Sequence, residues 1–575
     1  MIAKRVVLLG LAAVVGSASI SRAAGRQNSG QIVLNIVDPP GVGFNDPRPV
    51  SPVGGNGGTT LGAQRKIVFE TAASIWEVTL DPKVDIVIQS SFSPLPCTAA
   101  SGVLGAAGTI QVFANFEGAE WPNTWYHSAL GNHLQGEDLT PGPFDPGLLV
   151  PPFNDDIVAF FNGDIGVNPS CLTGLTWYNG LDNKPPSNGF DLLNVVLHEF
   201  AHGLGFANFA DDDAGTAFLG IGDIYQVYSR DDTSGLFWNQ MNKSQRSASA
   251  VNTSNLVWRG PNVFDAAPDV LGFRAKVLVE GDGEFEAQRA SFGASLKALP
   301  GVTAPLAVYN DGTGVSSDAC DGVDSRVRGK IALIDRGTCV FPLKAANAQA
   351  SGAKGVVIAN NVSNGFPTMG GADLVTPRIS SVGVTQAAGA FLKTRVGVNV
   401  TLAADPSFGL AGTDDGGFPR LYAPDPVQPG SSVSHWDITL SPNALMEPFL
   451  NADLKGAKTL DLTPAQMTDI GWNNGPHCPV GSDDRATVQV GSCSTGVFNA
   501  LGPFAFSIGT GLPSSGNANG IEMNGGCYIQ DMVNACLLQS TSGQVGSCIE
   551  HTANHLANVG AISSQQAQAI KNCAT

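Results

Sequence analysis

Short segments in the first part of the chain alternate between apolar and polar residues, as strands with one buried face do. Residues 83–89, KVDIVIQ, show this pattern most clearly, and residues 31–37 and 156–161 are further predicted strands. Residues 65–80 repeat their apolar side chains every three or four positions, which predicts a helix. A helix that leads into such a strand favours an α+β fold.

Residues 189–205, GFDLLNVVLHEFAHGLG, have the clearest helical pattern in the chain. Asp191 is suited to cap the first turn of this helix, and Gly203 and Gly205 are suited to end it. The apolar run LLNVVL indicates that the helix is buried within the fold.

The pattern changes near residue 267 and again near residue 408. The first change introduces a compact α/β unit, with two predicted strands and one helix at 330–334, 355–359 and 342–353. Residues 408–475 are rich in loops and contain one short predicted helix, 462–470. The last hundred residues hold six of the ten cysteines, which indicates a separate tail.

The first 24 residues have the pattern of a secretory signal peptide. Lys4 and Arg5 precede an apolar run from Val6 to Val15, and small residues follow it. The run is too short to cross a bilayer as a helix, which takes about 20 residues. No later segment is long and apolar enough, so we expect a secreted protein without a transmembrane segment.

Composition agrees with an extracellular protein and argues against a nucleic-acid partner. The 575 residues include 31 Lys and Arg against 49 Asp and Glu, a net charge of −18, whereas nucleic-acid binding needs basic patches. Ten cysteines are an even number, which in an exported chain predicts disulfides. Proximity favours Cys97–Cys171 and Cys320–Cys339, and leaves the other six cysteines to pair among themselves.

The helix at 189–205 contains the candidate chemistry. His198 and His202 are four residues apart, so a helix places both imidazoles on one face, where they can bind one metal ion. Neutral imidazole is a common zinc ligand. Glu199 projects beside such an ion and is suited to act as general base on a zinc-activated water. The alternative is a chance arrangement on an amphipathic helix, a poor explanation in a chain with eight histidines.

Catalytic zinc usually has three protein ligands and one water, so a third ligand is needed. In peptidases with contiguous ligands, HExxHxxGxxH, the third histidine falls where this chain has Asn208. The carboxylates of Asp211, Asp212 and Asp213 lie just beyond, although acidic runs after a helix are more often solvated loops. Spacing alone leaves the third ligand open.

The motifs together resemble those of the leishmanolysin-like metzincins. These peptidases keep HExxHxxG and insert a long segment before a third histidine, which stands in a His-Trp-acid motif shortly before a Leu-Met turn. This chain has SHWD at 434–437 and then Leu445-Met446. The resemblance implies that His435 is the third zinc ligand, 233 residues after His202, and that Met446 lies beneath the metal. Asn208 is then not required as a ligand.

Residues 267–407 resemble a protease-associated (PA) domain. The matching features are RGKIALIDRGTCVF at 328–341, ASGAKG at 350–355 and the strand that follows. PA domains have no catalytic residues of their own, so the resemblance implies substrate access, recognition or packing, with a plain structural insert as the alternative. The predicted units are a signal peptide (1–24), a metzincin-like α+β catalytic domain in two parts (25–266 and 408–475), the α/β PA-like insert (267–407) and a small disulfide-rich C-terminal module (476–575).

These patterns predict a secreted zinc metallopeptidase, a metalloendopeptidase with one catalytic Zn²⁺ that acts on protein or peptide substrates. The alternative is a secreted binding protein or pseudo-peptidase that keeps the fold and the PA domain without an active zinc site. The two hypotheses differ at His435, because without it the site has only two ligands.

Overall fold

The structure, a computed structural model, describes residues 30–139, most of residues 155–472 and parts of residues 487–574. The positions left out between 155 and 472 are 291, 295, 297–299, 364, 368, 370–376 and 452. The predicted signal peptide, residues 1–24, lies outside the described residues.

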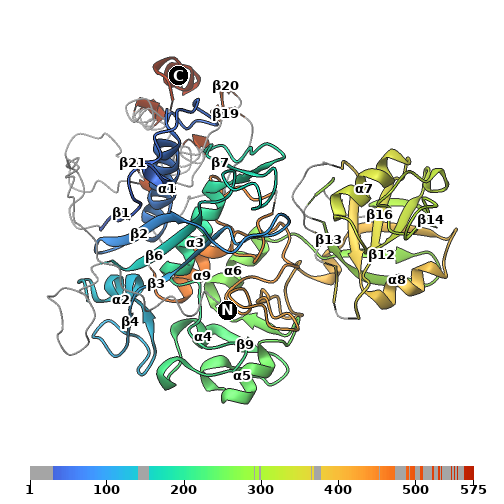
Figure 1. Ribbon diagram of the computed structural model, residues 1–575, viewed down its shortest axis with the longest axis horizontal. Helices are drawn as coiled ribbons and strands as arrows, with labels where there is room; N and C mark the ends of the chain where they lie inside the picture. Colours follow the sequence, from blue (N-terminus) through green and yellow to red (C-terminus); the bar gives the residue numbers. More distant parts are fainter. Residues whose placement is uncertain are drawn as a thin grey trace.

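A four-stranded sheet in the order β1-β2-β6-β3 forms the centre of the larger lobe (Figure 1). Its strands are β1 (Ile32–Ile36), β2 (Ile86–Ser93), β3 (Gly105–Thr109) and β6 (Ile157–Asn162). The first two and β6 are parallel, whereas β3 pairs antiparallel with β6. Alternate residues such as Ile86, Ile88 and Ile157 are fully buried, because one face of the sheet packs against helices.

Two long helices cover this face and pack against each other. α1 (Leu61–Leu80) lies over β1, and α3 (Leu192–Leu204) lies over β6 and β3. The Asp191 carboxylate caps α3, as predicted, by accepting hydrogen bonds from two N–H groups of its first turn. α3 ends at Gly205, where φ is 140° and a Cβ would lie 2.4 Å from Ile470 Cδ1. A side chain at this position would therefore be strained and would clash.

Shorter elements complete the larger lobe. The helices are α2 (Ser128–Gln135), α4 (Ile224–Tyr228), α5 (Lys243–Ser249), α6 (Pro261–Val270) and α9 (Thr463–Asp469). The strands are β4 (Val112–Phe113), β5 (Tyr126–His127), β7 (Thr176–Tyr178), β8 (Gly189–Asp191), β9 (Ser229–Asp231), β10 (Leu236–Phe237) and β11 (Leu256–Trp258).

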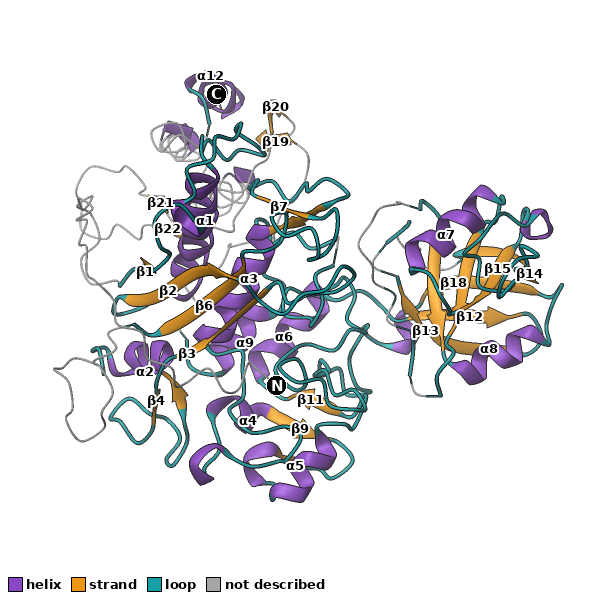
Figure 2. Cartoon of the chain, viewed as in Figure 1, coloured by secondary structure: helices purple, strands orange, loops and turns teal. Residues whose placement is uncertain are grey.

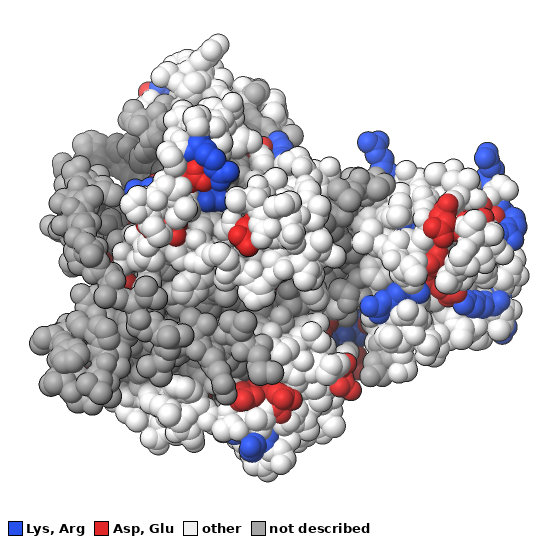
Figure 3. Space-filling view, viewed as in Figure 1, with Lys and Arg blue, Asp and Glu red and all other residues white. Residues whose placement is uncertain are grey.

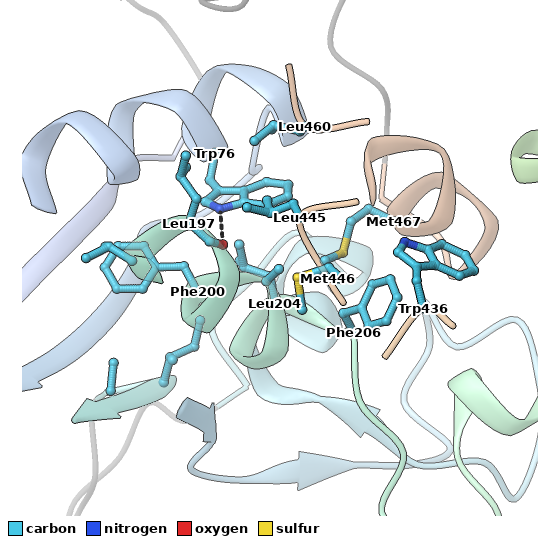
Figure 4. Packing of buried hydrophobic residues seen from close by; sticks show 14 of the residues in the cluster. Trp76, Leu197, Phe200, Leu204, Phe206, Trp436, Leu445, Met446, Leu460 and Met467 are labelled. Atoms are coloured by element: carbon cyan, nitrogen blue, oxygen red, sulfur yellow. Dashed lines mark hydrogen bonds between the residues drawn. The ribbon is translucent and has the colours of Figure 1, made fainter. Parts of the chain in front are cut away.

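One hydrophobic core joins two segments that are distant in sequence. Its buried residues come from 32–271 and from 421–472, and none of its described members comes from between them. Figure 4 shows part of this core, where the Trp76 indole N–H donates to the Leu197 carbonyl at 3.0 Å, and where Met446 of the second segment lies. The two segments therefore form one body.

The residues between these segments form a closed barrel with the strand order β12-β13-β17-β16-β15-β14-β18. Its elements are β12 (Ala275–Val279), β13 (Gly283–Arg289), β14 (Val302–Val308), β15 (Ile331–Asp335), α7 (Phe341–Ala350), β16 (Gly355–Ala359), β17 (Ser380–Val384), α8 (Gln386–Lys393) and β18 (Asn399–Ala404). Figures 1 and 2 show the barrel as a separate lobe. Phe273 and Leu410 pair antiparallel at its base, so the two connections run side by side.

Most of the predicted helices and strands are present with shifted ends. α1 begins four residues before the predicted start, because the Thr60 hydroxyl caps it by accepting from the Ala63 N–H. The helix predicted at 189–205 begins only at Leu192, because residues 189–191 pair with β7 as strand β8. The fold is a mixture of helices and sheets, as predicted, and the boundaries of the predicted domains stay predictions.

The predicted disulfides Cys97–Cys171 and Cys320–Cys339 are both present. A third, Cys493–Cys573, joins β20 to α12 within the tail. The described tail elements are β19 (Thr487–Val490), β20 (Cys493–Phe498), β21 (Phe506–Ile508), β22 (Ile521–Met523) and α12 (Ser564–Ala574). The other four tail cysteines lie outside the described residues.

Within the described part of the chain, no helix combines the length and apolar character needed to span a bilayer. Figure 3 shows Lys and Arg side chains in separate small groups on the face in view, many of them on the barrel.

Candidate metal centre

Helix α3 places His198 and His202 one turn apart on the same face. Their Nε2 atoms are 3.1 Å from each other, the arrangement expected from the spacing of four residues. His202 is 9% exposed, and the ring of His198 is partly buried. The pair therefore projects from a helix in which every residue except His198 is buried.

His435 reaches the same point from a loop 233 residues further along the chain. Its Nε2 lies 3.2 Å from the Nε2 of His202 and 3.2 Å from that of His198. Backbone pairing with residues 421–422 fixes the loop, since the Tyr422 N–H donates to the His435 carbonyl at 2.9 Å. The structure thus brings all three predicted ligands together.

The contacts of the three Nδ1 atoms determine which nitrogen of each ring carries the proton. In each ring Nδ1 lies 2.7 Å from a backbone carbonyl oxygen, which can only accept a hydrogen bond. The acceptors belong to Leu445 for His198, Phe206 for His202 and Ser431 for His435. Each Nδ1 therefore carries the proton, and each Nε2 presents a lone pair to the other two.

Burial keeps these rings neutral. It lowers the pKa of His198 to about 4 and that of His202 to about 3, and it places the pKa of His435 well below the usual range. Three neutral imidazoles with lone pairs 3.1–3.2 Å apart repel one another unless a cation lies among them.

The donor set fits zinc. Zinc binds imidazole nitrogen at about 2.0–2.1 Å in tetrahedral sites, which puts neighbouring nitrogens about 3.3–3.4 Å apart. The separations of 3.1–3.2 Å are close to this value. Three histidine ligands would leave one of the four positions of a zinc ion for water, as in catalytic rather than structural zinc sites.

Glu199 lies next to His198 and is held by the edge strand β3. The Ala107 N–H donates to its carboxylate, while burial, the larger effect, raises the pKa of Glu199 to about 8. Gly105 of the same strand packs so closely that a Cβ there would lie 2.8 Å from Glu199 Cγ and 2.9 Å from Oε1. The glycine therefore leaves the space that this carboxylate occupies.

The predicted Leu-Met turn contacts two of the three ligand segments. The Leu445 carbonyl accepts from His198, and the Met446 carbonyl accepts from the Trp436 N–H at 2.9 Å. Met446 is fully buried and lies beside Leu445 and the α3 side chains in Figure 4. Trp436 packs edge-on against Phe206 with ring centroids 5.1 Å apart.

Asn208 stands where a contiguous motif would have its third histidine, and it is not part of the histidine cluster. Its backbone N–H and its side-chain amide both donate to Ser434 Oγ, at 3.1 Å and 3.0 Å. Ser434 directly precedes His435, so Asn208 ties the end of α3 to the loop that carries His435. Among the described residues, Asp211, Asp212 and Asp213 do not belong to the cluster either.

The sequence did not reveal the role of Gly105, the hydrogen bond from His198 to Leu445, or the hydrogen bonds from Asn208 to Ser434. Each acts through a backbone or packing contact with a segment far away in sequence, and a glycine or leucine gives no signal of such a role. Gly105 could have been recognised only once it was known that β3 is the edge strand that packs against α3.

Comparisons with known proteins identify the barrel. Residues 302–392, from β14 to α8, match the family model described as PA domain. The chain contains a PA domain. The match falls within the unit predicted at 267–407.

Two curated relatives share short stretches with the chain. Aminopeptidase YwaD of Bacillus subtilis (strain 168) is 39% identical over 92 residues, 16% of this chain and 17% of that protein. Signal peptide peptidase-like 4 of Oryza sativa subsp. japonica is 34% identical over 85 residues, 14% of each. The chain thus spans less than a fifth of the length of either relative.

Two solved structures are similar to limited parts of this chain. BSAP, a zinc aminopeptidase from Bacillus subtilis, is 26% identical with a TM-score of 0.19, over 24% of this chain and 35% of that chain. The aminopeptidase from Aneurinibacillus sp. strain AM-1 is 22% identical with a TM-score of 0.19, over 32% and 41%. TM-scores this low do not define the fold of the larger lobe.

Proposed function

We propose that this protein is a zinc-dependent peptidase of the leishmanolysin-like metzincin type. His198, His202 and His435 hold one catalytic ion, and Glu199 handles the protons. The observation that carries the proposal is the convergence of three unprotonated Nε2 atoms, 3.1–3.2 Å apart, beside a buried carboxylate. The peptidase names of the relatives, and the PA domain, support the same class of activity.

Glu199 performs the proton transfers in this account. When bound, zinc supplies Lewis acidity that polarises the scissile carbonyl and activates water. Glu199 accepts the proton of the attacking water and later donates it to the leaving amine. Burial raises the pKa of Glu199 from the usual carboxyl range to about 8, and a cation beside it would favour the carboxylate form that accepts the proton. The Ala107 N–H and the close backbone of Gly105 keep the carboxylate in place during both transfers.

We further propose endopeptidase action. Among the described residues the ligand cluster consists of three histidines, and the carboxylate beside it, Glu199, is assigned to proton transfer, so the cluster offers no acidic ligand for a free amino terminus or a second ion. An aminopeptidase needs recognition of that amino terminus, whereas an endopeptidase does not.

Peptides with blocked ends test both proposals. The wild type is expected to cleave an internally quenched peptide acetylated at its N-terminus and amidated at its C-terminus, and to leave an aminoacyl p-nitroanilide with a free amine intact. Glu199→Gln is expected to reduce this cleavage by about 10²–10⁴-fold, the usual contribution of a general base, while zinc stays bound. Near wild-type turnover by Glu199→Gln would show that the assigned mechanism is wrong. Cleavage of the anilide alone would favour aminopeptidase action.

We also propose that the protein is secreted and that residues 1–24 are removed on export. The three disulfides in the described residues support an oxidising compartment. N-terminal sequencing of protein from culture medium tests this, and a mature chain that still begins at Met1 would contradict it.

A further inference from the structure

Asp461 is a buried carboxylate that contacts the residue holding one of the proposed ligands. Its Oδ2 accepts from the Leu445 N–H at 2.5 Å, and its Oδ1 accepts from the Leu462 N–H at 2.6 Å. The carbonyl of the same Leu445 accepts from Nδ1 of His198 at 2.7 Å. A continuous path of hydrogen bonds therefore runs from the Asp461 carboxylate through Leu445 to His198.

Asp461 occupies this position against two unfavourable effects. Its backbone φ is 47°, in the left-handed region, which is costly for a residue with a side chain although aspartate tolerates it better than most. Burial disfavours its charge and raises its pKa to about 7. Residues held in this way are over-determined by their surroundings and cluster at functional sites.

The other two ligands do not depend on such a distant residue. His202 donates to the Phe206 carbonyl just beyond its own helix, where the Phe206 N–H is bound to the Ala201 carbonyl. His435 donates to the Ser431 carbonyl within its own loop. The acceptor of His198 instead lies on the Leu-Met turn, and among the hydrogen bonds of the described residues only Asp461 binds the Leu445 N–H.

We propose that Asp461 is a positioning residue that fixes the ring of His198 through Leu445 and thereby sets the metal affinity of the site. This proposal rests on the proposed function, because it takes His198 to be a zinc ligand. Metal-binding histidines generally donate their second N–H to a group that orients the ring, and loss of that group usually costs about 10–100-fold in affinity or activity. Here the orienting carbonyl belongs to a turn, and the Asp461 carboxylate holds that turn.

Two substitutions separate the carboxylate from the backbone strain. Asp461→Gly removes the side chain but accepts the left-handed conformation freely. Asp461→Asn keeps the shape and tolerates the same conformation, but replaces one acceptor oxygen with an NH₂ group that cannot accept from a facing N–H. Asp469→Asn is the matched control, because Asp469 is 5% exposed and accepts from Trp258 Nε1 at 2.8 Å without a path to a ligand.

The experiment measures the zinc affinity of the full-length variants by competition with a chromophoric chelator, and the visible absorption of their Co²⁺ forms. The dissociation constant for zinc is expected to rise about 10–100-fold in Asp461→Gly and less in Asp461→Asn. The Co²⁺ spectrum should change in both, while Asp469→Asn keeps the wild-type affinity and spectrum. A substitution that only lowered the stability of the fold, without changing the position of the His198 ring, would leave the Co²⁺ absorption bands unchanged.

Wild-type zinc affinity and an unchanged Co²⁺ spectrum in a folded Asp461→Gly variant would overturn the proposal. If the glycine variant does not fold, the same result in the isosteric Asp461→Asn variant overturns it. A wild type that binds zinc but cleaves no peptide would overturn only the proposed function, whereas a wild type without zinc would overturn both.

Discussion

At the scale of single residues, the proposed site depends on which ring nitrogen carries the proton. The three carbonyls that accept from Nδ1 leave three Nε2 lone pairs directed at one point. Burial lowers the pKa of each ring, so the rings stay unprotonated and the repulsion between their lone pairs remains. The arrangement therefore fits a cation bound among the three rings.

A buried ion pair in the PA domain gives a residue-scale prediction about pH. Lys276 and Asp405 form a salt bridge, and its hydrogen bond lowers the pKa of Asp405 to about 2. A lowered folded-state pKa contributes stability above the unfolded value of about 3.9, and that stability is lost as the pH falls through about 2. Asp405→Asn keeps the contact of Oδ1 with Ser407 but loses the ion pair.

We therefore expect Asp405→Asn to melt at a lower temperature than the wild type at pH 6. The difference should narrow below about pH 4 and vanish below about pH 2, where the wild-type carboxyl is protonated as well. Thermal unfolding followed by circular dichroism across this range measures it. A difference that stays constant with pH would show that the ion pair is not its cause.

At the scale of elements, edge strand β3 and helix α3 together shape the position of the general base. Gly105 faces Glu199 so closely that Gly105→Ala must displace the carboxylate. We expect this variant to lose about 10²-fold in kcat/KM, the effect of a misplacement of about 1 Å, with zinc still bound. Gly108→Ala on the same strand is the control, because a Cβ there meets nothing within 4 Å. Equal activities of the two variants would contradict this role of β3.

The same elements show which features of the site could be predicted from the sequence. α3, its Asp191 cap and the shared face of His198 and His202 follow from local periodicity and could be predicted. The position of His435 followed only from a resemblance, because no local pattern spans 233 residues. The contacts of Gly105, Leu445 and Asn208 arise when distant segments pack, and tertiary packing leaves no trace in the periodicity of any one segment.

At the scale of the whole molecule, the PA domain is an insertion whose two ends meet. Phe273 and Leu410 pair at its base, so a short linker can replace the barrel without moving the flanking core segments. The barrel touches the ligand region through Gln288, whose Nε2 donates to the Ile438 carbonyl at 2.5 Å, three residues after His435.

We expect a variant with residues 275–404 replaced by a Gly/Ser linker to fold, to bind zinc and to cleave a small blocked peptide. Loss of the Gln288 contact should reduce its activity by no more than about 10-fold, since a single neutral hydrogen bond contributes about 1 kcal/mol. Gln288→Ala in the intact chain is the control for that contact. A folded variant that binds no zinc would show that the PA domain is part of the metal site.

The central claim is that His435 completes one zinc site with His198 and His202, and the zinc content of purified protein tests it most directly. Elemental analysis of the wild type should give about one zinc per chain, and a folded His435→Ala variant should retain only a small fraction after dialysis, because two ligands bind far more weakly than three. A His435→Ala variant that keeps the full zinc content of the wild type would contradict the account.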